Sequence, residues 1–127
     1  MRASPMPKES GLPRFRFLIV LLALLPQLAQ AHAILVAGSP SIGATVPAGR
    51  FAIELRFNSR IDRSRSRLSL VAPDMTRTVL QTADNAPPEM LRAGAELKPG
   101  AYTLRWQVLA IDGHITRGDV PFTVGGK

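Results

Sequence analysis

Two histidines and one aspartate are the residues of this sequence best suited to binding a metal ion. His32 follows the segment "LAQA", and His114 ends the segment "DGH", in which Asp112 stands two residues earlier. In a chain that begins at His32, the free α-amine and the imidazole Nδ1 close a six-membered chelate ring on a metal. The pKa of such an amine is about 8, so a metal displaces its proton at neutral pH. On an extended backbone residues i and i+2 point to the same side, so Asp112 and His114 can converge.

Nitrogen ligands together with one carboxylate match the tetragonal coordination that Cu(II) prefers. We therefore predict a mononuclear site that holds one Cu(II) per chain through His32, Asp112 and His114. Structural roles are the alternative, because "DGH" is also a common turn, His114 can hydrogen-bond at a strand end and His32 can be incidental. The joint placement of the chain's two histidines favours the metal site.

Catalytic chemistry of other kinds has little support in the sequence. No nucleophile elbow presents a serine to His114, no glycine-rich loop is present for phosphate, and the acidic residues are scattered. The chain has no cysteine, which removes thiolates from any metal or redox site. We therefore expect that the protein is not an enzyme.

The predicted chelate requires removal of the residues before His32. A basic N-terminal stretch is followed by the uncharged apolar run "FLIVLLALLP" and then by "AQA", a pattern typical of a secretory signal peptide. A membrane anchor is the alternative, but it needs about 20 apolar residues to cross the bilayer. We predict a signal peptide over residues 1–31, cleaved after Ala31, and one exported domain over residues 32–127.

The net charge of +7 owes much to basic residues in that N-terminal segment. Beyond it, basic residues are densest in "NSRIDRSRSRLSL", which contains Arg60, Arg63, Arg65 and Arg67. Such a run forms either an anion-binding patch or, as is more common, a solvated face or loop. Aromatic residues do not interleave with it, so we predict no nucleic-acid partner.

Short strands separated by turns are expected to position the candidate site. In "RFAIELRFN" and "AYTLRWQVL" apolar residues alternate with other residues, as in a half-buried antiparallel strand. Proline and glycine fix turns between the runs, including residues 39–49 and 111–118. No segment after residue 32 sustains a 3.6-residue apolar period. We predict an all-β Greek-key sandwich or barrel of about seven strands, at residues 34–38, 50–58, 67–72, 76–82, 90–97, 101–109 and 120–124.

Four stretches of the chain carry a set of motifs: "HAILVAGSPSIGATV", "IELRF", "LKPGAYTLRWQVLAIDGH" and "GDVPFTV". Together they resemble the CopC-type periplasmic copper-binding and copper-resistance proteins. The segment "HAILVAGSPSIGATV" is similar to the family's opening, H-A-x-L-x-x-x-x-P-x-x-G-x-x-V. "IELRF" resembles its next strand, "LKPGAYTLRWQVLAIDGH" its L-x-x-G-x-Y-x-V-x-W-x-x-x-S-x-D-x-H stretch, and "GDVPFTV" its closing G-x-x-x-F-x-V. The match extends over essentially the whole chain after residue 31.

The resemblance implies a Greek-key β-sandwich of cupredoxin-like or immunoglobulin-like shape that binds Cu(II) in the periplasm. Carried over by position, His32 supplies its amine and its imidazole, and Asp112 and His114 complete the site. The implied function is that of a copper carrier or buffer in copper homeostasis or resistance. We expect a monomer whose partner is an inner-membrane copper transporter or another cuproprotein. Trp106 matches the core tryptophan of the family and is expected to be a packing residue.

Three features depart from the family pattern. Asn58 and Ser59 stand where some members have an acid near copper, and Ile115 follows the second histidine where many members have proline. Members that also hold Cu(I) have a methionine-rich segment, since thioethers favour that ion. Beyond residue 31 this chain has only Met75 and Met90, so we expect binding of Cu(II) alone.

Two other functions are compatible with the same residues. An N-terminal histidine and a second histidine also build the site of histidine-brace copper oxygenases, although Asp112 would occupy a position that oxygen needs. The other alternative is a metal-free immunoglobulin-like interaction domain in which the histidines have no role in binding.

Overall fold

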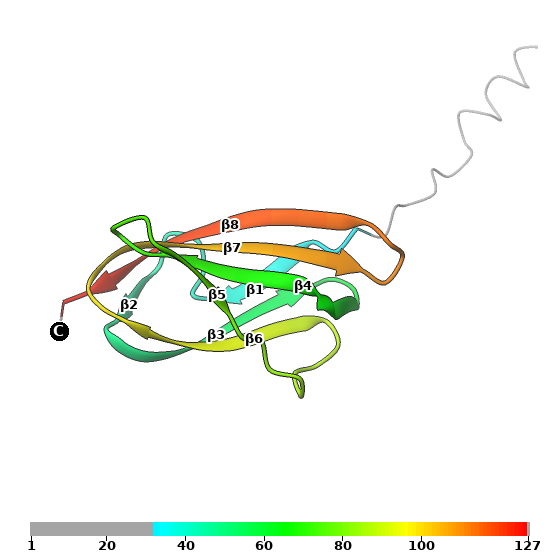
Figure 1. The fold of residues 1–127 in the computed structure, drawn as a ribbon, viewed down its shortest axis with the longest axis horizontal. Helices are drawn as coiled ribbons and strands as arrows, with labels where there is room; N and C mark the ends of the chain where they lie inside the picture. Colours follow the sequence, from blue (N-terminus) through cyan, green and yellow to red (C-terminus); the bar gives the residue numbers. More distant parts are fainter. Residues whose placement is uncertain (1–31, 127) are drawn as a thin grey trace, which may run out of the picture. The chain divides into compact units, whose positions relative to one another are not determined.

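The computed structural model describes residues 32–126, which form a sandwich of two β-sheets (Figure 1). One sheet has the strand order β1-β3-β6, and the other has the order β2-β8-β7-β4-β5. Within the described residues there is no helix long and apolar enough to cross a membrane. The strands of this region are β1 (Leu35–Ser39), β2 (Thr45–Pro47), β3 (Gly49–Phe57), β4 (Ile61–Val71), β5 (Arg77–Leu80), β6 (Met90–Leu97), β7 (Gly100–Ala110) and β8 (Ile115–Gly125).

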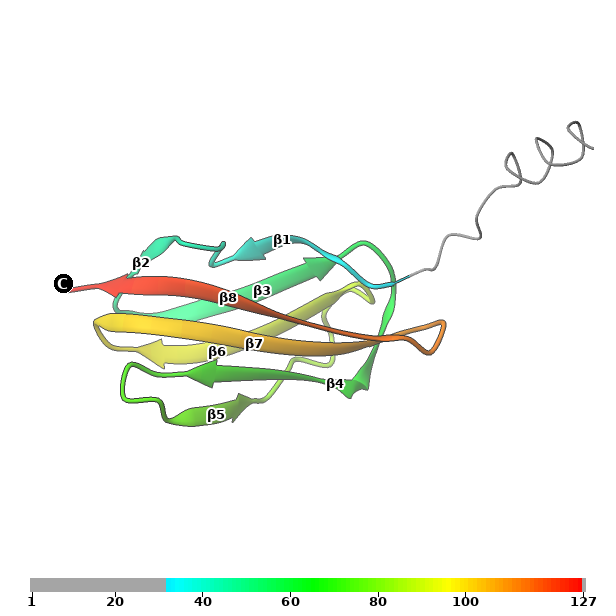
Figure 2. The same ribbon diagram turned by 90° about the horizontal axis from the view of Figure 1, so that it is seen from above.

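The topology is that of a Greek-key sandwich. The chain passes from one sheet to the other five times, between β1 and β2, β2 and β3, β3 and β4, β5 and β6, and β6 and β7. The strands pair antiparallel except β2, which runs parallel to β8. This confirms the predicted all-β class. The β7–β8 turn and the start of β1 lie at the same end of the sandwich, and the end of β8 lies at the opposite end (Figure 2).

The alternation in the sequence predicts the buried faces of the long strands. Trp106 packs edge-on against Phe57, with ring centroids 5.0 Å apart. Gly118 lies directly opposite Trp106 on β8, and a Cβ atom at residue 118 would lie 2.4 Å from Cζ2 of the indole. The indole therefore fits only because residue 118 has no side chain. The inward positions of β3, β7 and β8 are buried as expected: Ile53, Leu55, Phe57, Tyr102, Leu104, Trp106, Val108, Val120, Phe122 and Val124.

Two segments that were predicted as turns contain strand residues. Residues 39–49 include β2, a three-residue strand at the edge of the five-stranded sheet. So short a strand shows no alternation, and its proline favours a turn assignment. Residues 111–118 include the start of β8, because the β7–β8 hairpin stays paired as far as Leu109 and Ile115. The turn itself is confined to residues 111–114.

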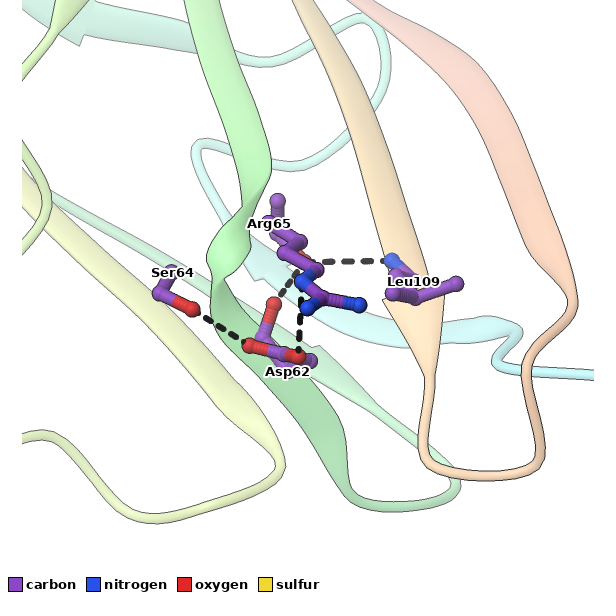
Figure 3. Close-up of polar contacts among 5 residues, drawn as sticks. Asp62, Ser64, Arg65 and Leu109 are labelled. Carbon is purple, nitrogen blue, oxygen red and sulfur yellow. Dashed lines mark hydrogen bonds and ion pairs between the residues drawn. The ribbon is translucent and has the colours of Figure 1, made fainter.

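Strand β4 leaves its pairing with β7 between Asp62 and Arg67. Ser66 Oγ bridges this irregular segment, because it accepts a hydrogen bond from the Leu109 N–H at 3.1 Å and donates one to the Asp62 carbonyl at 2.7 Å. Ser64 Oγ donates to the Asp62 carboxylate at 2.7 Å (Figure 3). Serine hydroxyls therefore replace some of the backbone pairing that the interruption removes.

The arginine run is consequently divided among different environments. Arg65 Nε lies 3.8 Å from the Asp62 carboxylate (Figure 3), whereas Arg67 belongs to the regular part of β4. The guanidinium of Arg63 donates to three carbonyls of the loop before β6, so this residue holds the loop rather than offering its charge to an anion. Those carbonyls belong to Asp84, Ala86 and Pro87.

The predicted signal peptide, residues 1–31, lies outside the described residues.

Candidate metal centre

The turn between β7 and β8 brings Asp112 and His114 together. The Gly113 N–H donates to the Ala110 carbonyl at 2.9 Å, and the Ala110 N–H donates to the His114 carbonyl at 2.8 Å. Gly113 has a φ of 94°, a conformation that glycine adopts without steric cost. The turn is therefore fixed by its own backbone and by the glycine between the two candidate ligands.

The Asp112 carboxylate contacts His114 twice. Its Oδ1 accepts a hydrogen bond from the His114 backbone N–H at 3.1 Å, and its Oδ2 lies 3.1 Å from His114 Nδ1. The predicted reason for their convergence, an extended backbone, is wrong, because both residues lie in the turn. They meet because an aspartate side chain readily hydrogen-bonds the backbone two residues further on. Both side chains stay accessible, with 28% of Asp112 and 49% of His114 exposed.

These contacts lower the pKa of Asp112 below its usual value. The hydrogen bond from the His114 backbone N–H is the largest cause, and partial desolvation opposes it. Smaller contributions come from the His114 side chain and from the charge of His32. The carboxylate is therefore held in its ionised form, the form that binds a metal.

The residues that follow His32 are anchored to both sheets. Ala33 is fully buried, and its carbonyl accepts a hydrogen bond from Thr116 Oγ1 on β8 at 2.7 Å. The Ile34 N–H donates to Asn58 Oδ1 at 2.8 Å, and the Asn58 N–H donates to the Ile34 carbonyl at 2.9 Å. Since Asn58 directly follows β3, these contacts hold the chain beside His32 against the ends of two strands.

The two histidine rings meet at this end of the sandwich. Their centroids are 4.8 Å apart and their planes are inclined by 75°, an edge-to-face contact. The three predicted residues are thus brought together as a chain of pairs, His32 to His114 and His114 to Asp112. Among residues 32–126 no three histidine, cysteine, aspartate or glutamate side chains already surround a common point as metal ligands.

The donor atoms at this place are imidazole nitrogens and carboxylate oxygens. His114 offers an imidazole nitrogen and Asp112 a carboxylate oxygen, and these two groups contact each other in this structure. The backbone nitrogen of His32 is part of the peptide bond to Ala31, so it becomes an amine donor only when Ala31 is removed. The arrangement then supplies the nitrogen and carboxylate set that suits Cu(II).

Asn58 and Thr116 position the chain beside His32, and the sequence does not reveal either role. Their hydrogen bonds join residues that are 24 and 83 positions apart, so no local motif records them. In the sequence, residue 58 stands out only because it is an asparagine at a position where some CopC-type proteins have an acidic residue. In the structure the side-chain oxygen of Asn58 accepts a hydrogen bond from the Ile34 N–H, which holds the backbone next to His32 in place.

The two methionines beyond residue 31 lie in different elements. Met75 occupies the turn between β4 and β5 and is 75% exposed, whereas Met90 begins β6. The Met90 sulfur accepts a hydrogen bond from Arg92 Nη2 at 3.6 Å. Neither methionine belongs to the segments that hold His32 and His114.

Comparison with known proteins identifies the family. A family model described as the CopC domain matches residues 35–125. The crystal structure of CopC from Methylosinus trichosporium OB3b is similar, with a TM-score of 0.67 and 30% identity, covering 75% of this chain and 95% of that one.

Curated relatives agree with this match. Protein YobA of Escherichia coli (strain K12) is 29% identical over 115 residues, which cover 87% of this chain and 93% of YobA. The copper transport protein CutJ of Bacillus subtilis (strain 168) is 24% identical over 113 residues, which cover 85% of this chain but only 21% of CutJ. With the family model spanning strands β1 to β8, the chain belongs to the CopC family.

Proposed function

We propose that the protein binds one Cu(II) ion per chain through His32, Asp112 and His114, and that it acts as a copper carrier or buffer. The observation that carries this proposal is the contact of the two histidine rings, 4.8 Å apart, beside the Asp112 carboxylate. When the chain begins at His32, its α-amine and Nδ1 form one chelate ring. An imidazole nitrogen of His114 and an Asp112 oxygen then supply the remaining ligands, with the metal replacing the contact between these two side chains.

The family and the donor atoms support copper as the metal and Cu(II) as its oxidation state. The relative from Bacillus subtilis is named a copper transport protein. Cu(I) favours soft sulfur ligands, but this chain lacks cysteine, and Met75 and Met90 lie in different elements. Nitrogen and carboxylate ligands therefore dominate the proposed site.

Export of the protein is the second part of the proposal. The signal-peptide pattern of residues 1–31 implies cleavage after Ala31 and a periplasmic domain over residues 32–127. The same cleavage creates the α-amine of His32, so processing and metal binding are linked. A protein retained with its leader lacks one of the proposed ligands.

The site favours a carrier rather than an enzyme. Asp112 fills a coordination position that an oxygenase would leave open for oxygen. Almost half of the His114 side chain is exposed, so a copper-exchanging partner can reach it. We propose that the protein works as a monomer and exchanges copper with an inner-membrane copper transporter or another cuproprotein.

Mass spectrometry followed by a copper titration tests this function. The intact mass of the exported protein is expected to correspond to a chain that starts at His32. Isothermal titration with Cu(II) is then expected to saturate at one ion per chain. A protein that starts at His32 and shows no saturable binding would contradict the proposal and favour a metal-free interaction domain.

A separate assay distinguishes a carrier from an oxygenase. The copper-loaded protein is incubated with a reductant and oxygen, and the peroxide formed is compared with that from the same amount of free Cu(II). A carrier is expected to suppress peroxide formation. Sustained turnover by the loaded protein would assign it to the histidine-brace class instead.

A further inference from the structure

The outer face of the five-stranded sheet carries a hollow of about 450 Å³ that is rich in arginine. Its lining includes one arginine from each of four strands, and we call these four residues the arginine face: Arg67 on β4, Arg77 on β5, Arg105 on β7 and Arg117 on β8. None of the four belongs to the proposed copper site. All four side chains are exposed.

The strand register places the four arginines around two polar residues that also line the hollow, Ser69 and Gln107. Ser69 lies opposite Arg105 on one side and Val79 on the other, and it is only 5% exposed. Gln107 lies between Arg67 on β4 and Arg117 on β8. Arginine side chains therefore surround a buried hydroxyl residue and a glutamine amide.

Positive charge on this face exceeds negative charge. Asp119 is the single acid in the lining of the hollow, and it pairs with Arg105 at 3.5 Å. Arg117 Nε donates to the neutral Gln107 at 2.7 Å. No hydrogen bond or ion pair within residues 32–126 holds the guanidinium of Arg67 or Arg77.

Like charges gathered on one face repel each other unless counter-charges or salt compensate them. A guanidinium offers a planar fork of donors that matches a carboxylate better than a lysine ammonium does. The excess charge and the unpaired guanidinium groups therefore fit a ligand that carries several carboxylates.

The spacing of the arginines indicates the shape of that ligand. The row runs from Arg77 on β5 to Arg117 on β8, three strands apart, a backbone separation of about 14 Å at the usual inter-strand distance. One phosphate or one carboxylate is shorter than this row and would engage only part of it. In an extended peptide, residues i and i+4 point to the same side and are separated by about 13 Å, nearly the same length. A planar membrane is less suitable, because Val79 is the single exposed large apolar residue of the lining and membrane-bound surfaces insert several.

We propose that the arginine face binds an extended acidic segment of a partner protein, which crosses β5, β4, β7 and β8 and places its carboxylates against the guanidinium groups. The inference goes beyond the proposed function and does not depend on copper. It concerns a different face of the sandwich and different residues.

A labelled acidic peptide tests the proposal. Binding of fluorescein-labelled octaglutamate to the metal-free protein is followed by fluorescence anisotropy. The R67Q/R77Q variant removes two arginines whose guanidinium groups form no hydrogen bond or ion pair within residues 32–126, so the fold should be unaffected. We expect its affinity to fall roughly five- to tenfold, as for the loss of two exposed charge pairs. Raising the salt from ~20 mM to ~200 mM should weaken binding to the wild-type protein.

A matched variant separates a specific face from net charge. R50Q/R56Q removes the same charge from exposed positions of β3 in the other sheet, and it should bind octaglutamate like the wild-type protein. Equal losses in both variants, or no binding to the wild-type protein, would overturn the proposal. Binding to phosphatidylglycerol vesicles that R67Q/R77Q abolishes, without peptide binding, would also overturn it and assign the face to a membrane. Thermal melting confirms that each variant is folded.

Discussion

The imidazole rings of His32 and His114 meet edge to face, 4.8 Å apart, although one precedes the first strand and the other precedes the last. A different set of contacts positions each ring. The β7–β8 turn and the Asp112 carboxylate orient His114, whereas hydrogen bonds to Ala33 and to Ile34 fix the chain beside His32. The candidate site is therefore held mainly by the ends of strands and needs no long loop.

Replacement of His114 tests whether this ring binds copper. His114→Ala removes one imidazole, and the electron paramagnetic resonance spectrum of the Cu(II) form is expected to show fewer coordinated nitrogens. Ile115→Ala is a suitable control, because Ile115 is the next residue and its side chain is 53% exposed. An unchanged spectrum for His114→Ala would remove this residue from the site.

Replacement of Asp112 tests the role of its charge. Asp112→Asn keeps an oxygen that accepts the His114 N–H, but it loses the negative charge and the acceptor that faces His114 Nδ1. Loss of a ligand or of its orienting partner is expected to weaken Cu(II) binding about 10- to 100-fold. Isothermal titration measures the change, with Asp119→Asn as a control for net charge. Equal affinities of Asp112→Asn and the wild-type protein would exclude Asp112 from the site.

The hydrogen bond from the Ile34 N–H to Asn58 Oδ1 is expected to influence both the stability of the fold and copper binding. Asn58→Ala removes the acceptor of the Ile34 N–H and should lower the free energy of unfolding by roughly 1 kcal/mol. Copper affinity should also fall, because the chain beside His32 becomes less ordered. Asn58→Asp keeps the acceptor oxygen and should retain the stability. Urea unfolding measures the first effect, and an alanine variant as stable as the wild-type protein would contradict it.

Much of the fold can be predicted from the sequence because the long strands alternate regularly. In β3, in β7 and in β8 from Val120 onward the inward residues are apolar, so these strands and their buried faces are predictable. The start of β8 is not, because Thr116 and Gly118 interrupt the apolar pattern. Strand β2 is not, since its three residues are too few for a pattern and depend on pairing with β8. The interruption of β4 is also hidden, because it depends on a hydrogen bond between Ser66 and the distant Leu109.

The proposed members of the candidate site can be named from the sequence, but their arrangement cannot. His32, Asp112 and His114 have distinctive side chains, and the structure brings all three together. The turn contact between Asp112 and His114 differs from the expected extended arrangement, because Gly113 allows the chain to reverse. Support from Asn58 and Thr116 arises only when distant segments fold against each other.

Gly118 is expected to be essential for the core beneath the five-stranded sheet. Gly118→Ala places a Cβ 2.4 Å from the Trp106 ring, and this overpacking should destabilise the fold by roughly 1–3 kcal/mol. Gly125→Ala is the matched control, because its Cβ would lie 3.7 Å from the nearest atom, an ordinary contact. Urea unfolding of both variants tests this, and equal stabilities would show that the indole moves without cost.

The most direct test of the account compares Cu(II) affinity in two forms of the protein, one that starts at His32 and one that retains Ala31. A competing chromophoric chelator measures both affinities under the same conditions. Retention of Ala31 turns the α-amine into a peptide nitrogen, so the affinity is expected to fall by about two orders of magnitude or more. Equal affinities would contradict the central claim that the freed terminus of His32 binds the metal.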